Sequence, residues 1–215
     1  MPSSFDVRAA YLEGAHRAQD LIQREDVRAR WAEPSALSQM TIGELIGHLG
    51  RAILQVVTCL DAQLPQRQTS VNAERYEASL SGTADLGSDL NVGVRERAAE
   101  TAADGPEHLI EAVQTALARL RTPLASLANP TMAIPIHPGE VMAFDEYLRT
   151  RCVELAVHLD DLALSLGIEP SIPARTLAVA VEVLVGAARL RSGDAAVLHA
   201  LARRERDSID ALRIF

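Results

Sequence analysis

Apolar side chains recur every three or four positions along most of the chain, with charged residues between them. This is the period of an α-helix that buries one face in a core. No alternation of apolar and polar residues lasts long enough to specify a β-sheet. The sequence therefore predicts an all-α fold, a helical bundle with long connecting loops. The expected helices cover residues 5–22, 41–60, 86–121, 144–166, 173–190 and 194–205. The segment 86–121 divides into two parts at residues 104–106.

Helix ends and loops carry their own signals. Thr41 and Glu44 have the spacing of a capping box, and Gly167 closes the long helix before it. Two stretches lack a clear period: residues 63–85, with a short helix over 73–80, and a second loop rich in proline. That loop is marked by Pro123, Pro130, Pro135 and Pro138. We interpret residues 1–170 as the bundle and residues 171–215 as a short helical extension packed on it.

Composition excludes several kinds of chemistry. The 215 residues include 21 basic residues, all of them arginine, and 29 acidic ones, for a net charge of −8. Mechanisms that need a lysine Schiff base or a phosphate-loop lysine are therefore excluded. The acidic balance disfavours a nucleic-acid partner, which usually needs a basic footprint.

The cysteines and the apolar runs indicate where the protein resides. Cys59 and Cys152 each lie inside an apolar helical pattern, which is typical of reduced, buried thiols rather than a disulfide framework. No segment reaches the roughly 18 uncharged apolar residues of a membrane span. We expect a cytoplasmic protein that has no membrane partner.

Candidate chemistry begins with a glutamate and two histidines. Glu154 and His158 are four residues apart, so one helical turn places them on the same face, on one flank of the apolar stripe. His48 lies beside the stripe of an earlier helix. Two imidazoles and a carboxylate form a common divalent-metal set with an open position. A Glu/His pair of this spacing is more often a solvated pair, and spacing alone does not show that the two helices face each other.

Two segments make the chain resemble a known family. The segments TIGELIGHLGRA, with its central histidine, and EYLRTRCVELAVHLDDLALSLG, with its E-x3-H motif, resemble the mycothiol-dependent maleylpyruvate isomerase amino-terminal family. That family is similar to the DinB-like metal-binding four-helix bundles. The resemblance implies a divalent metal on His48, Glu154 and His158. Zinc suits this donor set best, with nickel, cobalt and iron as alternatives.

The resemblance also implies a function. It indicates a metal- and mycothiol-dependent transferase or isomerase acting on a small electrophilic substrate, with the metal-activated thiolate as nucleophile. The chain then needs no catalytic cysteine of its own. The alternative is a non-enzymatic module that binds a metal or a small ligand on the same bundle. The sequence sets neither the substrate nor the oligomeric state, and it assigns no further catalytic residue.

A few other polar residues have a functional and a plain interpretation. Arg51, three residues after His48, is the predicted cofactor contact, where it could recognise a carboxylate or sugar oxygens of the thiol; a surface ion pair is the plainer interpretation. Asp161 is placed to orient His158. His137, on its loop, could hang over the cleft as an acid, but a loop histidine is usually solvated. We expect Arg149 and Arg151, on the long helix, to be exposed to solvent.

Overall fold

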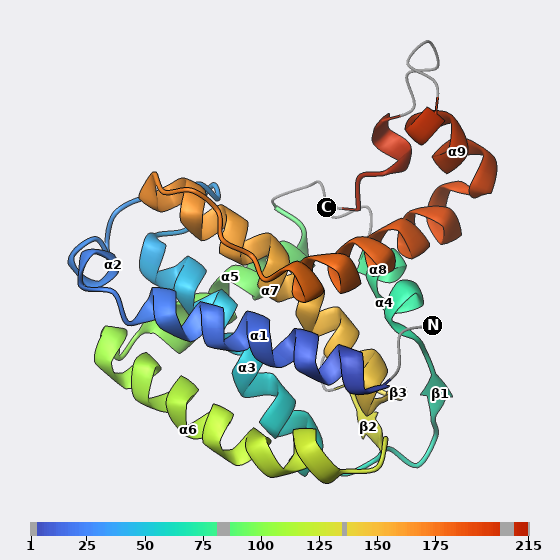
Figure 1. Ribbon diagram of the computed structural model, residues 1–215, viewed down its shortest axis with the longest axis horizontal. Helices are drawn as coiled ribbons and strands as arrows, with labels where there is room; N and C mark the ends of the chain where they lie inside the picture. Colours follow the sequence, from blue (N-terminus) through green and yellow to red (C-terminus); the bar gives the residue numbers. More distant parts are fainter. Residues whose placement is uncertain (1–3, 81–86, 135–136, 203–208, 215) are drawn as a thin grey trace.

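Helices form most of the chain in the computed structural model, which describes residues 4–80, 87–134, 137–202 and 209–214 (Figure 1). None of the described helices combines the length and apolarity needed to cross a membrane. The helices are α1 (Ser4–Ile22), α2 (Glu25–Ala29), α3 (Ile42–Asp61), α4 (Ala73–Leu80), α5 (Asp89–Ala102), α6 (Gly105–Ser126), α7 (Phe144–Leu166), α8 (Ala174–Ser192) and α9 (Asp194–Ala202), followed by a 3-10 turn, η1 (Ile209–Ala211).

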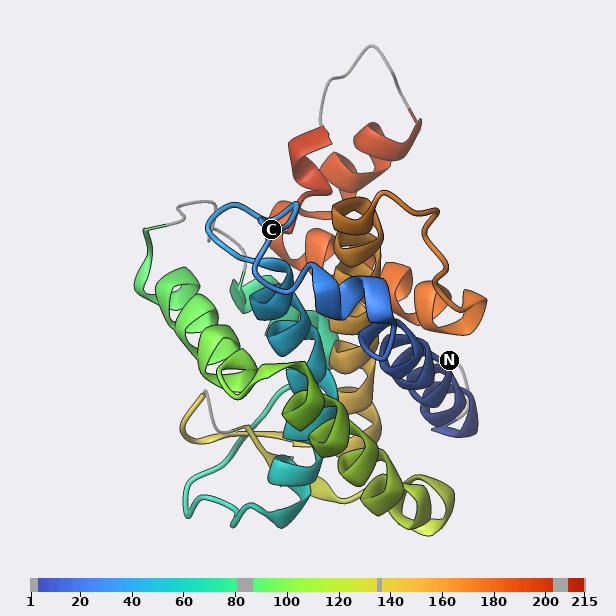
Figure 2. The same ribbon diagram turned by 90° about the vertical axis from the view of Figure 1, so that its left-hand side faces the viewer.

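Four long helices surround one hydrophobic core. Helix α1 packs against α6 and α7, and α3 packs against the same two helices, as Figures 1 and 2 show. The stripe residues of α3 and α7 are almost all buried. Burying one large apolar side chain contributes about 1.5–3 kcal/mol, so this core supplies most of the driving force for folding. The prediction of an all-α bundle is confirmed.

Both helix-end signals are confirmed. The backbone N–H of Glu44 donates to Thr41 Oγ1 at 3.2 Å, and the N–H of Thr41 donates to Glu44 Oε2 at 2.6 Å. The capping box thus satisfies two donors at the start of α3, which is the helix that carries His48. Gly167 ends α7 with a φ of 68°, a left-handed conformation that glycine adopts without steric cost.

The expectation that the chain forms no sheet was wrong. A small three-stranded sheet of order β1-β3-β2 lies beside the bundle: β1 (Thr69–Ser70), β2 (Thr131–Ala133) and β3 (Glu140–Ala143). Strands β2 and β3 pair antiparallel, and β1 joins β3 in parallel. Strands of two to four residues are too short to show an alternating pattern, so they could not be predicted from the residue pattern.

The proline-rich loop also begins later than its first proline suggests. Pro123 lies inside α6, which continues to Ser126 instead of ending near Arg121. Proline at this point removes one helical hydrogen-bond donor but does not end the helix. The division of the preceding segment at residues 104–106 into two helices is confirmed, since α5 ends at Ala102 and α6 begins at Gly105.

Helix α8 packs on the bundle, whereas α9 does not. Helix α8 packs against α1, α4 and α7, and Val179 and Val183 of α8 belong to the main core. Helix α9 and η1 pack instead on the far end of α8, around a small cluster that includes Val197 and Ile214, and α9 projects from the bundle in Figure 1. The predicted boundary at residue 170 stays an interpretation. Residues 203–205 of the last predicted helix lie outside the described part.

Candidate metal centre and its pocket

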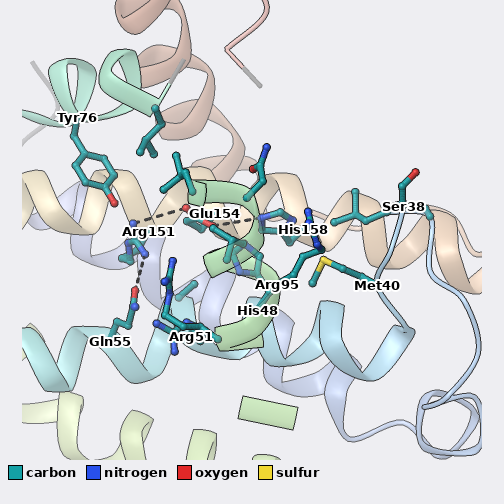
Figure 3. A pocket seen from close by; sticks show the side chains of 18 residues that line it. Ser38, Met40, His48, Arg51, Gln55, Tyr76, Arg95, Arg151, Glu154 and His158 are labelled. Atoms are coloured by element: carbon teal, nitrogen blue, oxygen red, sulfur yellow. Dashed lines mark hydrogen bonds and ion pairs between the residues drawn. The ribbon is translucent and has the colours of Figure 1, made fainter. Parts of the chain in front are cut away.

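The two packed helices α3 and α7 bring His48, Glu154 and His158 together (Figure 3). Glu154 Oε2 lies 3.3 Å from Nε2 of His48 and 3.3 Å from Nε2 of His158. The two imidazole rings meet edge to face, with their centroids 4.4 Å apart. The geometry therefore supplies the facing arrangement of helices that residue spacing alone left open.

These donor atoms have the spacing of a small cation site. One donor atom from each residue falls within 4.8 Å of the other two. Bonds of about 2.0–2.1 Å to a tetrahedral zinc ion place neighbouring donors roughly 3.4 Å apart, which is close to the two measured separations of 3.3 Å. The three residues therefore fit a divalent cation.

Asp161 orients His158, as the sequence predicted. The carboxylate Oδ2 of Asp161 lies 2.9 Å from Nδ1 of His158, one turn further along α7. A carboxylate at this nitrogen favours a proton on Nδ1, which leaves Nε2 facing Glu154. Ligating imidazoles are usually fixed by a partner of this kind.

Burial and their mutual hydrogen bonds shift the pKa values of the three residues. Burial opposes the charged form of His158, but the hydrogen bonds to Asp161 and Glu154 outweigh it and raise its pKa to about 9. Burial also opposes ionisation of Glu154, yet its hydrogen bonds with His158 and His48 hold the pKa of this carboxyl well below its usual range. Burial and the charge of His158 lower the pKa of His48. At neutral pH His158 therefore favours its protonated form, and a cation that binds its Nε2 displaces that proton.

The prediction that Arg149 and Arg151 are exposed was wrong. Both side chains are buried, because this end of α7 is covered by α3, α4 and α8. Arg149 forms ion pairs with Glu74 at 2.6 Å, Glu146 at 3.0 Å and Glu182 at 3.2 Å, which join α4, α7 and α8. A network of this kind stabilises the junction more than an isolated surface pair would.

Arg151 belongs to the site itself. Its guanidinium donates to Gln55 Oε1 at 3.3 Å, stacks 4.9 Å from the centre of the Tyr147 ring and lies 3.8 Å from Glu154 Oε1. The available signal was spacing: Arg151 precedes Glu154 by three residues, so one turn of α7 places both on the same face. Sequence reasoning assigned the long side chain to solvent because charged residues are usually exposed.

A pocket of about 520 Å³ opens beside the three predicted ligands. Its walls come from α3, α4, α5, α7 and the segment before α3, and they combine arginines with apolar side chains such as Met40, Leu80 and Val94. Figure 3 shows His48, Glu154 and His158 at the pocket together with Arg51, Arg95 and Arg151. This volume is within the range of small-molecule sites. The pocket brings Arg51 beside the metal ligands; its role as cofactor contact stays a prediction.

His137 does not line the pocket, but it packs against Tyr76, which does. Its ring packs edge to face against Tyr76, with 5.3 Å between centroids, and its Nδ1 lies 3.6 Å from Glu140 Oε2. The side chain is 25% exposed, so the expected full solvation is only partly met. It is not among the residues that line the pocket.

Both cysteines are buried in the core, as predicted, and neither lines the pocket. Burial raises the pKa of Cys152 to about 12 and also raises the pKa of Cys59. Thiols with raised pKa values carry little thiolate at neutral pH, and the thiolate is the nucleophilic form. The structure therefore supports the interpretation of both residues as small buried hydrophobes.

Glu77 on α4 is a buried acid that sequence reasoning missed. Its side chain is fully buried, and neither carboxylate oxygen has a hydrogen-bond partner among the described residues. Burial and the nearby charge of Glu154 raise its pKa to about 8, with Arg151 opposing part of the effect. The sequence predicted only that Glu77 lies in a short helix, one residue after Tyr76. No sequence signal distinguished it from a surface glutamate.

We expect Glu77→Gln to change how stability depends on pH. The pKa of Glu77 is higher in the folded than in the unfolded chain. The contribution of its protonated form to the free energy of unfolding is therefore complete below the unfolded pKa near 4.5, and it is lost as pH rises to about 8. The stability of the variant relative to the parent should therefore increase over this interval, by on the order of 4 kcal/mol. Urea unfolding of both proteins at pH 5 and pH 8.5, with chelator present, measures it. Parallel pH profiles would contradict the prediction.

Fold and site together define a helical-bundle protein with a His-Glu-His cluster at a pocket. Comparison with known families goes one step further. Residues 11–163 match the sequence profile of the mycothiol maleylpyruvate isomerase N-terminal domain. The chain belongs to this family. This outcome confirms the resemblance drawn from the two sequence segments.

Solved structures agree with this assignment at the level of the fold. The chain is similar to the crystal structure of the mycothiol-dependent maleylpyruvate isomerase, with a TM-score of 0.53 and 18% sequence identity over 86% of this chain and 68% of the other. A variant of that isomerase in which a histidine is replaced by alanine matches with the same values. No protein with a curated description matches the sequence.

Proposed function

We propose that the chain is an enzyme that uses mycothiol and a divalent cation to transform a small electrophile by group transfer or isomerisation. The observation that carries the proposal is the gathering of three donor atoms at the wall of a pocket whose volume is in the range of small-molecule sites. Membership of a family named for a mycothiol-dependent isomerase supports the same activity. Two reduced, buried cysteines are in keeping with a cytoplasmic location.

His48, Glu154 and His158 would hold the cation, with zinc the best match to two imidazoles and a carboxylate. When bound, a divalent cation lowers the pKa of a thiol at its open position and supplies thiolate at neutral pH. Asp161 keeps Nε2 of His158 directed at the site. Apolar side chains such as Met40, Leu80 and Val94 line part of the pocket, and apolar surroundings strengthen electrostatic interactions at reacting groups.

A steady-state assay tests the proposal. Purified protein is given a panel of small electrophiles with mycothiol present, omitted, or replaced by a thiol without its sugar portion. We expect turnover only with both metal and mycothiol, because the chain offers no reactive thiol of its own. Equal rates with and without mycothiol would overturn the thiol mechanism. Cation and mycothiol binding without turnover on any electrophile would favour the non-enzymatic binding module.

A further inference from the structure

A buried arginine lies beside the predicted metal ligands, one turn earlier on α7. Arg151 precedes Glu154 by three residues, and its side chain is buried. An arginine keeps its charge when it is buried, so other groups must offset the cost of removing that charge from water. Among the described residues, Glu154 is the one carboxylate within 4 Å of this guanidinium. The buried charge of Arg151 is therefore directed at a predicted metal ligand.

The two carboxylate oxygens of Glu154 have different neighbours. Oε2 lies 3.3 Å from Nε2 of His48 and 3.3 Å from Nε2 of His158. Oε1 lies instead 3.8 Å from Nη2 of Arg151. A carboxylate binds a cation through one oxygen or through both. In this arrangement Oε2 faces the other two donors, while Oε1 faces a positive charge.

Further contacts hold the Arg151 guanidinium independently of Glu154. Its Nη1 donates to Gln55 Oε1 at 3.3 Å, and its Nε donates to Thr150 Oγ1 at 3.2 Å. The group also stacks 4.9 Å from the centre of the Tyr147 ring. Figure 3 shows the guanidinium between Gln55 and Glu154, with dashed lines to both. Arg151 is thus fixed by uncharged partners, so it can hold the carboxylate in place.

The same helix supplies a metal ligand and an anchor for the arginine. His48 and Gln55 are seven residues apart on α3, and two helical turns place them on one face. Both residues line the pocket, and so do Arg151 and Glu154 from α7. The packing of α3 against α7 therefore positions the arginine together with the three donors.

The number of oxygens that Glu154 contributes decides how much of the coordination of a cation remains open. Two imidazoles and one carboxylate oxygen are three donors, and catalytic zinc sites keep a fourth position for water or substrate. A second oxygen from Glu154 would compete for that position. The charge of Arg151 opposes this competition, because it attracts Oε1 and repels a cation that approaches Oε1.

We propose that Arg151 is a positioning residue that limits Glu154 to one metal-binding oxygen, Oε2, and so keeps a coordination position free for the thiol. The proposal rests on the metal centre of the proposed function. A cation site gains no affinity from a neighbouring arginine, since like charges repel each other. A role in shaping the site therefore accounts for a buried arginine at this position.

Cobalt(II) tests the proposal without turnover. Its visible absorption bands weaken as its coordination number rises, and a thiolate bound to it adds a charge-transfer band in the near ultraviolet. Purified protein is stripped with chelator, loaded with cobalt(II) and titrated with 2-mercaptoethanol. We expect Arg151→Met to bind cobalt(II) at least as tightly as the parent, because a repelling charge is gone, but with weaker visible bands. Its affinity for 2-mercaptoethanol should fall at least about tenfold, because Oε1 then occupies the open position most of the time.

Two further variants separate positioning from packing. Arg151→Lys keeps the charge and should restore most of the band intensity and the thiol affinity. Gln55→Leu removes an anchor and should weaken 2-mercaptoethanol about threefold, in keeping with one lost hydrogen bond. If Arg151→Met does not fold, Gln55→Leu decides the matter, and an unchanged thiol affinity in this variant overturns the proposal.

Arg149→Lys is the matched control on the same helix. Arg149 is also buried, but its partners are glutamates at the junction of α4, α7 and α8, and it does not line the pocket. Its variant should lower the melting temperature and leave both the cobalt(II) spectrum and the thiol affinity within about twofold of the parent values. Melting curves of all variants separate lost binding from lost folding.

The outcomes distinguish this inference from the proposed function. A purely structural role for Arg151 predicts the opposite sign, so weaker cobalt(II) binding in a folded Arg151→Met would overturn the inference. Unchanged bands and thiol affinity, or no restoration by lysine, would overturn it as well while the metal centre stands. A folded parent that binds no cobalt(II) would remove the metal centre and the inference together. If all variants behave as expected but no electrophile reacts, the positioning role stands and the proposed enzyme does not.

Discussion

Replacing His158 by alanine is expected to remove most of the divalent cation from the purified protein. The substitution deletes one of three donors in a site whose remaining donors, on His48 and Glu154, lie on different helices. Losing even an outer partner of a metal ligand costs about 10–100-fold in affinity, so losing a ligand should cost at least about 100-fold. Elemental analysis of the purified variant and calorimetric titration with zinc measure the loss.

His137→Ala is the matched control for this experiment. His137 packs on Tyr76, is not itself a lining residue and is not one of the three clustered donors, so its variant should keep about one equivalent of metal. Chelation should also lower the melting temperature of the parent and leave that of His158→Ala nearly unchanged. The reason is that a ligand bound only by the folded state adds about 2.7 kcal/mol to the free energy of unfolding when its concentration is a hundredfold above Kd. Equal metal loss in both histidine variants would reject the ligand assignment.

His48→Ala should abolish mycothiol-dependent turnover, whereas the double variant Cys59→Ala, Cys152→Ala should retain it. His48 is the one predicted ligand from α3, and an electrostatic group acting on the reacting atoms is typically worth 10²–10³-fold in rate. Both cysteines lie in the core, outside the pocket lining, with raised pKa values. Initial rates at saturating mycothiol, measured for each variant against the parent, give the comparison.

Stability must be measured beside these rates. Removing two buried sulfur atoms should cost about 1–3 kcal/mol, so the double variant is assayed well below its melting temperature. A folded double variant without thiol-dependent activity would show that the chain's own cysteine takes part in the reaction. Retained turnover in a folded His48→Ala variant would show that the metal centre is not the reactive site.

The chain's local patterns were enough to predict its long helices and to single out Glu154 and His158 as candidates for a metal site. The three- and four-residue periods, the capping box at Thr41 and the stop at Gly167 are short-range features, and each depends on contacts within one helix. The pair of Glu154 and His158 was visible for the same reason, because one helical turn always places such residues on the same face. Composition excluded lysine chemistry before any fold was known.

Features that join distant segments required the tertiary structure. The approach of His48 to Glu154, the pairing of β1 with β3, and the pocket wall shared by Arg51 and Arg97 all depend on how helices and loops pack, which a single-helix pattern does not encode. Burial of Arg151 and Glu77 was missed because charged residues usually remain in solvent, and only the neighbouring helices exclude water from them. The sequence by itself determined which side chains can share a helix face, and the packing of α3, α4, α5 and α7 decided which of them meet around a pocket.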